Sequence, residues 1–355
     1  MKAILLAGGK GTRLRPLTIH TPKPIVPIFN RPFLHYQIDL LKQVPEIDEV
    51  ILSLNYQPRR IEEIFGDGSN IGIKIRYVVE PAPLGTAGAI KYAGDQLTES
   101  VVVFNGDVLT QIDLGGVLRL HRERKARATI VLTPVDNPTA YGLVETDDAG
   151  NIRRFLEKPG PDEITTNNIN AGIYILETRV IDLIPPSVSH SIERGFFPAL
   201  LARGDVVFGP VHRGYWIDIG TPEKYLQVHR DILGGRFRVA LEAEARSGGF
   251  VARGARIADG ARLEAPFFVG PGCEIEAGAS VGPDAALAEG VRVRAGARVR
   301  DSVLWKGVEA GPESTIDGSL LGAGVRVGAH AVVRGAQLGD GSLVTDYSKS
   351  GGGAA

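Results

Sequence analysis

Residues 2–18 read Lys2-Ala3-Ile4-Leu5-Leu6-Ala7-Gly8-Gly9-Lys10-Gly11-Thr12-Arg13-Leu14-Arg15-Pro16-Leu17-Thr18, and Pro22-Lys23-Pro24 follows soon after. The apolar run that ends at Ala7 predicts a buried strand of a parallel sheet, because such strands are short, continuous and bounded by glycine. The glycines that follow allow a tight turn that brings bare backbone N–H groups against a ligand. Three cationic side chains share this loop without an acidic neighbour, so the loop suits a polyanion such as a nucleoside triphosphate.

The glycine motifs of other nucleotide-binding proteins do not account for this loop. Gly9-Lys10-Gly11 lacks the third glycine of the dinucleotide fingerprint, and the chain contains no G-x-x-x-x-G-K-[ST] pattern. The glycines alone are equally compatible with an ordinary strand-to-loop connection that carries incidental charge. The two prolines beside Lys23 fix the backbone there, so we expect its ammonium group to be held in place.

The composition excludes several classes of protein. The 355 residues predict about two domains, and a formal net charge of −1 gives no bulk attraction to nucleic acid or membranes. The single cysteine, Cys273, rules out an intrachain disulfide framework, which is typical of a reducing compartment. The apolar run after Met1 is too short for a signal peptide, and no run approaches the ~18 apolar residues that span a bilayer. We therefore expect a soluble, cytoplasmic protein.

Strand and helix patterns alternate in the N-terminal part of the chain. Asn30 is a good N-cap, and Pro32 a good first residue, for a helix that extends to about Val44. The elements expected next are strand 49–54, helix 58–65, strand 73–79, a helix opened by residues 84–88, and strand 101–104. This βαβαβ alternation predicts a Rossmann-like, mostly parallel sheet with helices on both faces. Ligands of such sheets bind beyond the carboxyl ends of the strands.

Two aspartates occupy positions that suit a metal site. Asp107 follows an apolar strand and a glycine, and Asp218 ends another apolar run, before a helix that Thr221 caps and Pro222 begins. Magnesium prefers one or two carboxylates together with substrate phosphates, so both aspartates are candidate Mg²⁺ ligands. Asp107 could equally cap the turn that follows it.

Three segments between these aspartates place polar groups beside strands. They are Tyr141-Gly142-Leu143-Val144, Phe155-Leu156-Glu157-Lys158-Pro159 and Asn168-Ile169-Asn170-Ala171-Gly172-Ile173-Tyr174. Sugar hydroxyls need carboxylate and amide partners, and a sugar phosphate needs a cation, which Glu157, Asn170 and Lys158 would supply. Taken alone, the Glu157–Lys158 pair is more typical of a solvated surface.

From Val251 onward the sequence has a period of six residues. Apolar residues recur without a break at Val251, Ile257, Leu263, Val269, Ile275, Val281, Leu287, Val293 and Val299. This period is typical of a left-handed hexapeptide β-helix. Trp305-Lys306-Gly307 interrupts the pattern, which resumes with a shift at Ile316, Leu321, Val327 and Val333. Residues 350–353 are rich in glycine and predict a disordered end.

These changes of pattern predict the domain boundaries. We expect an α/β domain at 1–234, a linker at 235–249, the hexapeptide-repeat β-helix at 250–346 and a tail at 347–355. Many β-helices of this kind are acyltransferases that use a histidine, but here His330 alone lies within the repeats, so a stacking and oligomerisation role is favoured. Cys273 lies at a repeat corner and is better explained as a small core residue than as a nucleophile.

The motifs together resemble those of a known family. The pattern G-G-x-G-T-R-L-R-P-L-T followed by P-K-P resembles the signature of the sugar-1-phosphate nucleotidyltransferases, and the resemblance extends over nearly the whole chain. It is strongest to the members that join GTP and mannose 1-phosphate. The stretches that carry this are Glu80-Pro81 with Leu84–Gly88, Asn137–Gly142, Asn168–Gly172, and Ser191-Ile192-Glu193 before Phe197-Pro198.

The resemblance implies a role for each matched residue. It assigns catalysis to Arg13 and Lys23, and the Mg²⁺ ion to Asp107 and Asp218. The nucleotide contacts that it implies are Leu6, Ala7, Gly8, Gly9, Gly11, Thr12, Arg13, Glu80, Gly85, Thr86 and Asp107. The implied sugar-phosphate contacts are Gly142, Glu157, Lys158 and Asn170.

The implied reaction is attack by a sugar 1-phosphate on the α-phosphorus of a nucleoside triphosphate, with release of pyrophosphate. A phosphate monoester with a second pKa near ~6 is already a dianion at neutral pH, so catalysis should depend on positioning and cations rather than on a general base. Two alternatives stay open: the same chemistry on glucose 1-phosphate with dTTP or UTP, and an inactive regulatory subunit that binds nucleotide sugars. The resemblance and the repeats also predict a homo-oligomer formed through the β-helix, without nucleic-acid or membrane partners.

Overall fold

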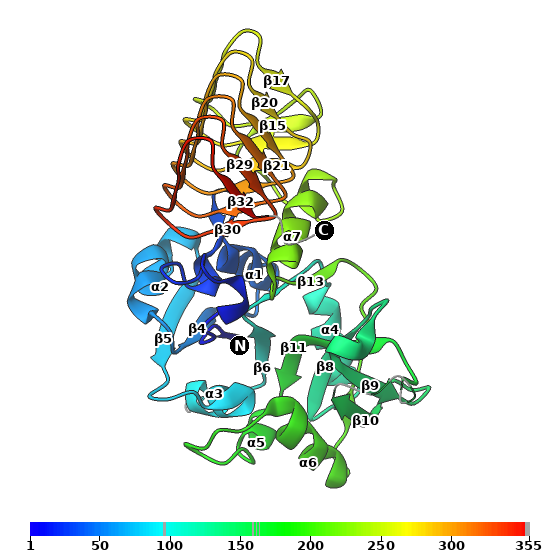
Figure 1. Ribbon diagram of the computed structural model, residues 1–355. Helices are drawn as coiled ribbons and strands as arrows, with labels where there is room; N and C mark the ends of the chain where they lie inside the picture. The colour runs from blue at the N-terminus through cyan, green and yellow to red at the C-terminus, as the bar shows by residue number, and fades with distance from the viewer. Residues whose placement is uncertain (95–96, 158–159, 161, 163, 352–355) are drawn as a thin grey trace. The chain divides into compact units, whose positions relative to one another are not determined.

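The computed structural model describes residues 1–94, 97–157, 160, 162 and 164–351. The chain forms two compact units (Figure 1). One comprises Met1–Gly9 and Leu34–Asp218, and the other Lys10–Phe33 and Ile219–Ala355. We call them the α/β unit and the β-helix unit. The segment Lys10–Phe33 therefore groups with the C-terminal repeats, although its sequence lies inside the α/β pattern.

A nine-stranded sheet organises the described part of the α/β unit. Its parallel half contains, in spatial order, β6 (Val101–Asn105), β1 (Lys2–Leu6), β4 (Glu49–Leu54) and β5 (Lys74–Val79). The other half contains β11 (Asn168–Leu176), β8 (Ala128–Pro134), β9 (Gly142–Thr146), β10 (Ile152–Glu157) and β12 (Val207–Phe208). β11 runs antiparallel to β6, β8 and β9, so the sheet is mixed. The predicted Rossmann-like parallel arrangement is confirmed for the first half.

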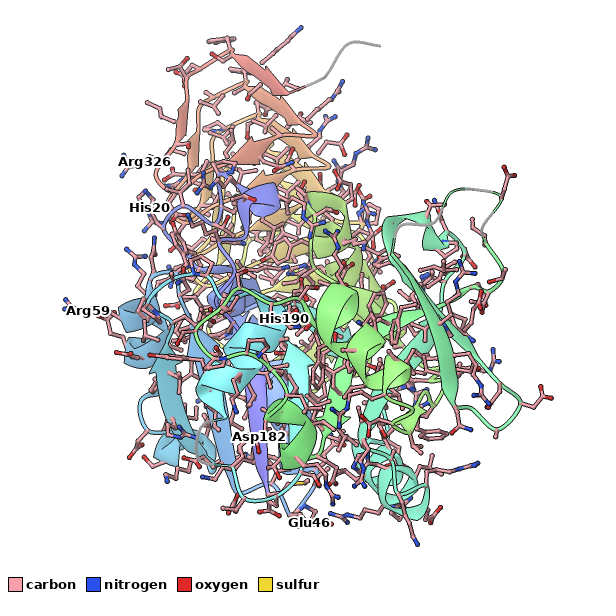
Figure 2. All side chains as sticks on the ribbon, turned by 90° about the horizontal axis from the view of Figure 1, so that it is seen from below. His20, Glu46, Arg59, Asp182, His190 and Arg326 are labelled. Atoms are coloured by element: carbon pink, nitrogen blue, oxygen red, sulfur yellow. The ribbon has the colours of Figure 1, made fainter. Side chains whose placement is uncertain are left out.

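Helices flank this sheet and bury their apolar sides against it. They are α1 (Phe33–Lys42), α2 (Pro58–Phe65), α3 (Gly85–Ala93), α4 (Leu114–Glu123), α5 (Thr178–Ile181) and α6 (Phe197–Ala202). Ile90 of α3 and Phe197 of α6 are fully buried in the same apolar core as Ile4. Ion pairing adds to this packing: Lys91 of α3 lies 2.8 Å from Asp182, a residue labelled in Figure 2.

The first helix begins later than the sequence predicts. Arg31 and Pro32 form the short strand β3 (Arg31–Pro32), which pairs with β2 (Pro27–Ile28), and α1 starts only at Phe33. Asn30 does not cap this helix, because its Oδ1 instead accepts a 2.8 Å hydrogen bond from the backbone N–H of Glu289 in the repeats. The prediction was wrong because a partner far away in sequence satisfies a side chain that also suits a cap.

Three parallel sheets form the predicted β-helix (Figure 1). The first contains β14 (Glu244–Arg246), β15 (Gly249–Val251), β18 (Phe267–Val269), β21 (Ala285–Leu287), β24 (Val303–Leu304), β27 (Leu320–Leu321) and β30 (Gln337–Leu338), with β14 antiparallel at its edge. The second contains β16 (Arg256–Ile257), β19 (Glu274–Ile275), β22 (Arg292–Val293), β25 (Glu309–Ala310), β28 (Arg326–Val327) and β31 (Leu343–Val344). The third contains β17 (Arg262–Leu263), β20 (Ser280–Val281), β23 (Arg298–Arg300), β26 (Thr315–Asp317), β29 (Val332–Arg334) and β32 (Lys349–Gly351).

The six-residue period shifts before Trp305, and not at Trp305-Lys306-Gly307 as the sequence predicts. Val281 pairs with Val299, 18 residues on, whereas Val299 pairs with Ile316, 17 residues on. The missing residue is at the corner formed by residues 300–302, just before Leu304 takes the core position. Trp305 therefore follows the shortened corner and does not cause it.

The last strand of the stack lies in the predicted tail. β32 pairs in parallel with β29, so residues 349–351 add a strand to the third sheet. The stack therefore ends later than the glycine-rich composition predicts. None of the helices within the described ranges is both long enough and apolar enough to span a membrane.

Candidate active site

The predicted site residues divide between the two units. In the α/β unit are Leu6, Ala7, Gly8, Gly9, Glu80, Gly85, Thr86, Asp107, Gly142, Asn170 and Asp218, and in the β-helix unit are Gly11, Thr12, Arg13 and Lys23. Gly142 is the first residue of β9. Glu157 is the last residue of β10, but its side chain lies outside the described residues, as does Lys158.

The first part of the glycine loop extends directly from β1. Leu6 ends the strand, and the N–H of Ala7 still donates to the carbonyl of Ser53 at 2.9 Å. A Cβ on Gly8 would lie only 3.3 Å from Glu80 Oε1, whereas a Cβ on Gly9 would meet nothing within 4 Å. The backbone at Gly9 is thus open to a ligand in the way that phosphate binding requires.

The second part of the loop folds over Lys23. Gly11 has φ +60°, a conformation that side chains rarely adopt, and its carbonyl accepts a 2.7 Å hydrogen bond from the Thr18 hydroxyl. The short 3₁₀ helix Thr12–Leu14 begins directly after it. A Cβ on Gly11 would lie 3.1 Å from Lys23 Cβ. Glycine at this position therefore allows the loop to pack closely on the lysine.

The two predicted catalytic cations are both held by close packing. Lys23 begins a 3₁₀ helix at Lys23–Ile25 and is only 9% exposed. Its carbonyl accepts from the N–H of Val26 at 3.2 Å. A Cβ on Gly220 would lie 3.0 Å from the Arg13 guanidinium, so this glycine makes room for the arginine. Burial of Lys23 lowers the local dielectric, which strengthens the action of its charge on a bound phosphate, whereas Arg13 is exposed.

Glu80 anchors the turn that leads to α3. It is buried, and its two carboxylate oxygens accept hydrogen bonds of 3.0 Å from the Ser53 hydroxyl and the Leu84 N–H. A carboxylate offers about four acceptor positions, so Glu80 keeps acceptor capacity beyond these two bonds.

Gly85 and Thr86 begin α3 under tight constraints. Gly85 has φ +67°, and a Cβ there would lie 2.7 Å from the carbonyl oxygen of His190. The Thr86 hydroxyl accepts a 2.9 Å hydrogen bond from the N–H of Ile192. The start of the helix is thus fixed against the 190–192 segment, which belongs to the same unit.

Asp107 directly precedes a two-stranded ribbon, and Asp218 is the last residue of one of its strands. β7 (Val108–Thr110) pairs antiparallel with β13 (Trp216–Asp218), and Asp218 is opposite Val108. Gln37 braces the turn that holds Asp107, because its side-chain amide donates to the carbonyls of Asn105 and Val108, both at 2.8 Å. The pairing thus brings Asp218 opposite the residue that follows Asp107.

This ribbon has the donor chemistry that a hard divalent cation requires. Within the described ranges, no three His, Cys, Asp or Glu side chains gather as a metal-binding group of their own. Two carboxylates are sufficient for an ion that also binds substrate phosphates and water. Two residues before Asp107, the buried Asn105 Oδ1 has no hydrogen-bond partner among the described residues, which makes the neighbourhood richer in available oxygen.

Asn170 joins two residues at the expected sugar side. Its amide nitrogen donates to Tyr174 Oη at 2.9 Å and to Glu193 Oε1 at 2.6 Å, while its Oδ1 accepts from the N–H of Gly172 at 2.9 Å. Burial, together with the charge of Glu193, raises the pKa of Tyr174, so its phenol keeps the proton. Asn170 therefore orients the Glu193 carboxylate.

Two residues that contact the predicted site residues, Glu193 beside Asn170 and Tyr141 beside Asp218, were missed as candidates. Glu193 belongs to a short π-helix, Ile192–Phe196, and the Tyr141 hydroxyl donates to Asp218 Oδ1 at 3.4 Å. The Tyr141 ring also packs edge-on against Trp216, 5.8 Å away. Both residues lie in stretches that carry the family resemblance, and that position was the available signal.

A mixed α/β sheet with an open glycine loop and two candidate metal-binding aspartates is the arrangement of a nucleotide-binding domain, in which ligands bind beyond the carboxyl ends of the strands. The family model described as nucleotidyl transferase matches residues 2–235, and the model described as the GMPPB C-terminal domain matches residues 250–347. The chain belongs to the nucleotidyl transferase family.

Individual relatives are similar over most of their length. A mannose-1-phosphate guanylyltransferase of Mycobacterium tuberculosis is 41% identical over 296 residues, which cover 83% of this chain and 81% of the relative. A UTP–glucose-1-phosphate uridylyltransferase of Synechocystis is 36% identical over 290 residues, 76% of this chain and 74% of the relative. The crystal structure of HddC from Yersinia pseudotuberculosis complexed with GMP-PN is 31% identical, with a TM-score of 0.55, and covers 64% of this chain and 96% of HddC.

Proposed function

We propose that the protein joins GTP and mannose 1-phosphate to form GDP-mannose and pyrophosphate. The observation that carries this is the 41% identity, over 83% of the chain, to a mannose-1-phosphate guanylyltransferase. The match of the C-terminal repeats to the GMPPB C-terminal domain supports the same conclusion.

Positive charge and backbone N–H groups would stabilise the triphosphate during transfer. The open backbone at Gly9, with Gly8, Gly11 and Arg13, suits the β- and γ-phosphates, and Lys23 suits the α-phosphoryl group, where charge develops. The attacking phosphate is already a dianion, so no side chain has to remove a proton. The residues act by holding two polyanions in line.

Asp107 and Asp218 are the residues that would hold Mg²⁺. When bound, this ion would offset phosphate charge and bring the two substrates together. The register of β7 and β13 supports the assignment, since Asp218 is opposite Val108, the residue that follows Asp107.

The sugar side would be read by Glu193 as well as by Asn170. Both side-chain N–H groups of Asn170 are used within the protein, so we assign it mainly to orienting the Glu193 carboxylate. A carboxylate accepts hydrogen bonds from sugar hydroxyls, and mannose differs from glucose only in the orientation of one hydroxyl. Gly142, Glu157 and Lys158 remain the proposed contacts for the rest of the sugar phosphate.

Guanine would be selected at the turn before α3. Guanine presents N–H donors on one edge, and Glu80 keeps acceptor capacity there. A wrong base would leave buried polar groups without partners, at a cost of about 1–3 kcal/mol for each group. The constrained backbone at Gly85 and Thr86, together with Leu6, Ala7 and Thr12, would shape the rest of the base and ribose site.

The similarity to a uridylyltransferase supports a second candidate, the same transfer with UTP and glucose 1-phosphate. An assay of pyrophosphate release, with each pair of substrates and Mg²⁺, tests the proposal. We expect release with GTP and mannose 1-phosphate, and loss of it in Lys23→Met. No release with any pair would favour an inactive regulatory subunit instead.

We further propose that the protein is cytoplasmic and forms a homo-oligomer through the β-helix. The proposed catalytic domain ends near residue 234, and the β-helix domain begins near residue 250. Two large side chains at the end of the stack support self-association, since Leu343 is 68% and Tyr347 74% exposed. Sedimentation of the full chain at several concentrations tests this: a single monomeric species would contradict it.

A further inference from the structure

One corner of the β-helix contains a side chain that the stack itself does not require. In the first sheet, each inward-facing core residue pairs with its equivalent in the next coil, so the residues that directly follow the core residues occupy equivalent corners. In order along the stack these residues are Ala252, Gly270, Ala288, Trp305, Gly322 and Gly339. One of them is large. The N–H of Trp305 donates to the carbonyl of Leu321 at 2.9 Å like its equivalents, so its backbone is regular.

The Trp305 side chain is buried by a helix outside the stack. Its ring lies edge-on to that of Tyr225 in α7 (Pro222–Leu233), at 6.5 Å, and its indole N–H donates to the Tyr225 hydroxyl at 3.0 Å. That hydroxyl donates in turn to the carbonyl of Pro27. Trp305 and Tyr225 are 3% and 1% exposed, so both hydrogen bonds are shielded from water.

Pro27 lies close to Lys23 along a backbone with little freedom. Between them, the N–H of Val26 donates to the Lys23 carbonyl at 3.2 Å, and Pro24 and Pro27 each have a fixed φ. The Val26 carbonyl accepts from the N–H of Phe33 at 3.0 Å. A shift of the Pro27 carbonyl therefore passes to the turn that holds Lys23.

Phe29 and Asn30, which follow Pro27, are also held by contacts with the repeats. Phe29 has φ +56°, which is unfavourable for an aromatic residue and persists only where the surroundings enforce it. Its ring packs edge-on against Phe268 at 4.6 Å, and its N–H donates to His229 Nε2 at 3.3 Å. Together with the Asn30–Glu289 bond, these contacts hold residues 27–30 against several coils.

We propose that Trp305 is a positioning residue for the transfer reaction: the β-helix holds the Lys23 ammonium in place through Tyr225 and the Pro27 carbonyl. The inference rests on the proposed role of Lys23. It gives the repeats a part in catalysis that is separate from oligomerisation.

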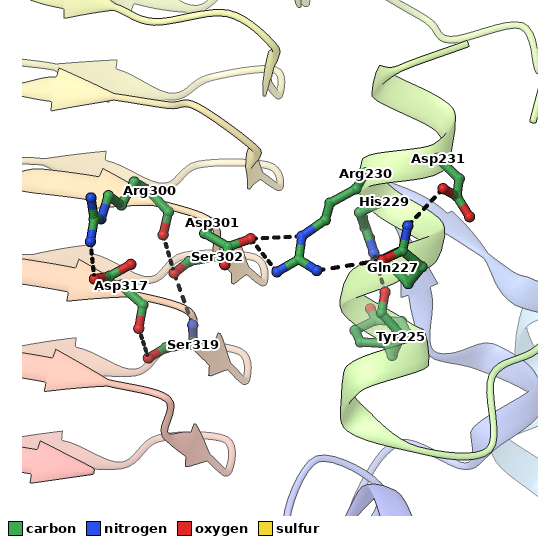
Figure 3. A network of polar contacts seen from close by, with 10 residues as sticks. All are labelled: Tyr225, Gln227, His229, Arg230, Asp231, Arg300, Asp301, Ser302, Asp317 and Ser319. Atoms are coloured by element: carbon green, nitrogen blue, oxygen red, sulfur yellow. Dashed lines mark hydrogen bonds and ion pairs between the residues drawn. The ribbon is translucent and has the colours of Figure 1, made fainter. Parts of the chain in front are cut away.

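The chain offers a matched control on the same helix. Arg230 of α7 donates two hydrogen bonds to Asp301 Oδ1, at 2.8 and 2.5 Å (Figure 3). Asp301 lies at the shortened corner of the stack and takes no part in the hydrogen bonds that join Trp305, Tyr225 and Pro27. Asp301→Asn therefore weakens the attachment of α7 to the repeats without removing a hydrogen bond from the path to Lys23.

The experiment compares steady-state kinetics and thermal unfolding of the full-length chain in four variants and one double variant. Tyr225→Phe removes the hydroxyl and keeps the ring, and Trp305→Phe removes the indole N–H and leaves a smaller aromatic ring in its place. We expect kcat to fall about tenfold in both, with KM for GTP and mannose 1-phosphate within about twofold. Asp301→Asn should keep kcat within about twofold, even where its melting temperature falls. Adding Trp305→Phe to Lys23→Met should lower kcat no further.

Any other result shows whether the positioning role of Trp305 or the proposed role of Lys23 is wrong. If Lys23→Met lowers kcat but Trp305→Phe and Tyr225→Phe do not, the inference is wrong and the proposed function stands. If Lys23→Met leaves kcat unchanged, the role of Lys23 fails and the inference fails with it. An equal loss in Asp301→Asn, or an undiminished effect of Trp305→Phe beside Lys23→Met, overturns the path through Lys23. Unfolding of both conservative variants would make the contact a folding requirement only, which also overturns it.

Discussion

His229 of α7 fits its surroundings only in the neutral form, which predicts a specific loss of stability in acid. Its Nδ1 lies 2.8 Å from the carbonyl of Tyr225, and its Nε2 accepts the N–H of Phe29. Because a carbonyl only accepts, the proton must be on Nδ1. A second proton on Nε2 would face the N–H of Phe29. Burial lowers the pKa of His229 from 6.5 to about 4.

The size of the effect follows from these two pKa values. Between pH 6.5 and about 4 the unfolded chain binds a proton at this position that the folded chain does not. The contribution of His229 to stability is therefore complete above pH 6.5 and declines as the pH falls toward 4. At pH 5 the loss from this one group is about 2 kcal/mol.

The assay is urea unfolding, followed by tryptophan fluorescence, at about pH 7.5 and pH 5 for the wild type and His229→Gln. The carboxylates and the other histidines titrate in both proteins, so the difference between the two losses isolates His229. We expect the wild type to lose about 2 kcal/mol more than the variant over this interval. Equal losses would refute both the neutral tautomer and the buried contact with Phe29.

Three further predictions concern the site and the repeats. Asp107→Asn and Asp218→Asn should each lower kcat by orders of magnitude at limiting Mg²⁺ while the melting temperature changes little; unchanged turnover in either removes that residue from the metal site. Glu193→Gln should raise KM for mannose 1-phosphate about tenfold and leave KM for GTP unchanged, and a shift in KM for GTP instead would place Glu193 elsewhere. A chain that ends after Gly234 keeps His229 but lacks Phe268, Glu289 and Trp305, the repeat residues that contact Phe29, Asn30 and Tyr225. It should lose both turnover and self-association in sedimentation, whereas an active oligomer would contradict the role of the repeats.

Local patterns in the sequence were sufficient for much of the fold. The strand at 49–54 and the helix at 58–65 have the predicted bounds, because apolar runs and a proline at the first helical position act over a few residues. The helix cap at Thr221 is also confirmed, since its side chain accepts from the N–H of Lys224. The period of six likewise follows directly from the geometry of one coil.

Contacts between residues far apart in sequence could not be predicted in this way. Asn30 has the side chain of a cap but bonds to Glu289, and nothing local distinguishes the two roles. Trp305 looks like a break in the repeat until its partner Tyr225, on a helix outside the stack, is known. Of the site, the glycine loop and the aspartates were readable as motifs, whereas the link from Asn170 to Glu193 depends on tertiary packing.

The central claim, formation of GDP-mannose, is tested most directly by kcat/KM for pyrophosphate release over a matrix of triphosphates and sugar 1-phosphates. GTP, UTP and dTTP would each be combined with mannose 1-phosphate and glucose 1-phosphate at a fixed Mg²⁺ concentration. We predict the highest kcat/KM for GTP with mannose 1-phosphate, with a stronger preference for the base than for the sugar. A higher kcat/KM for UTP or dTTP with glucose 1-phosphate would contradict it.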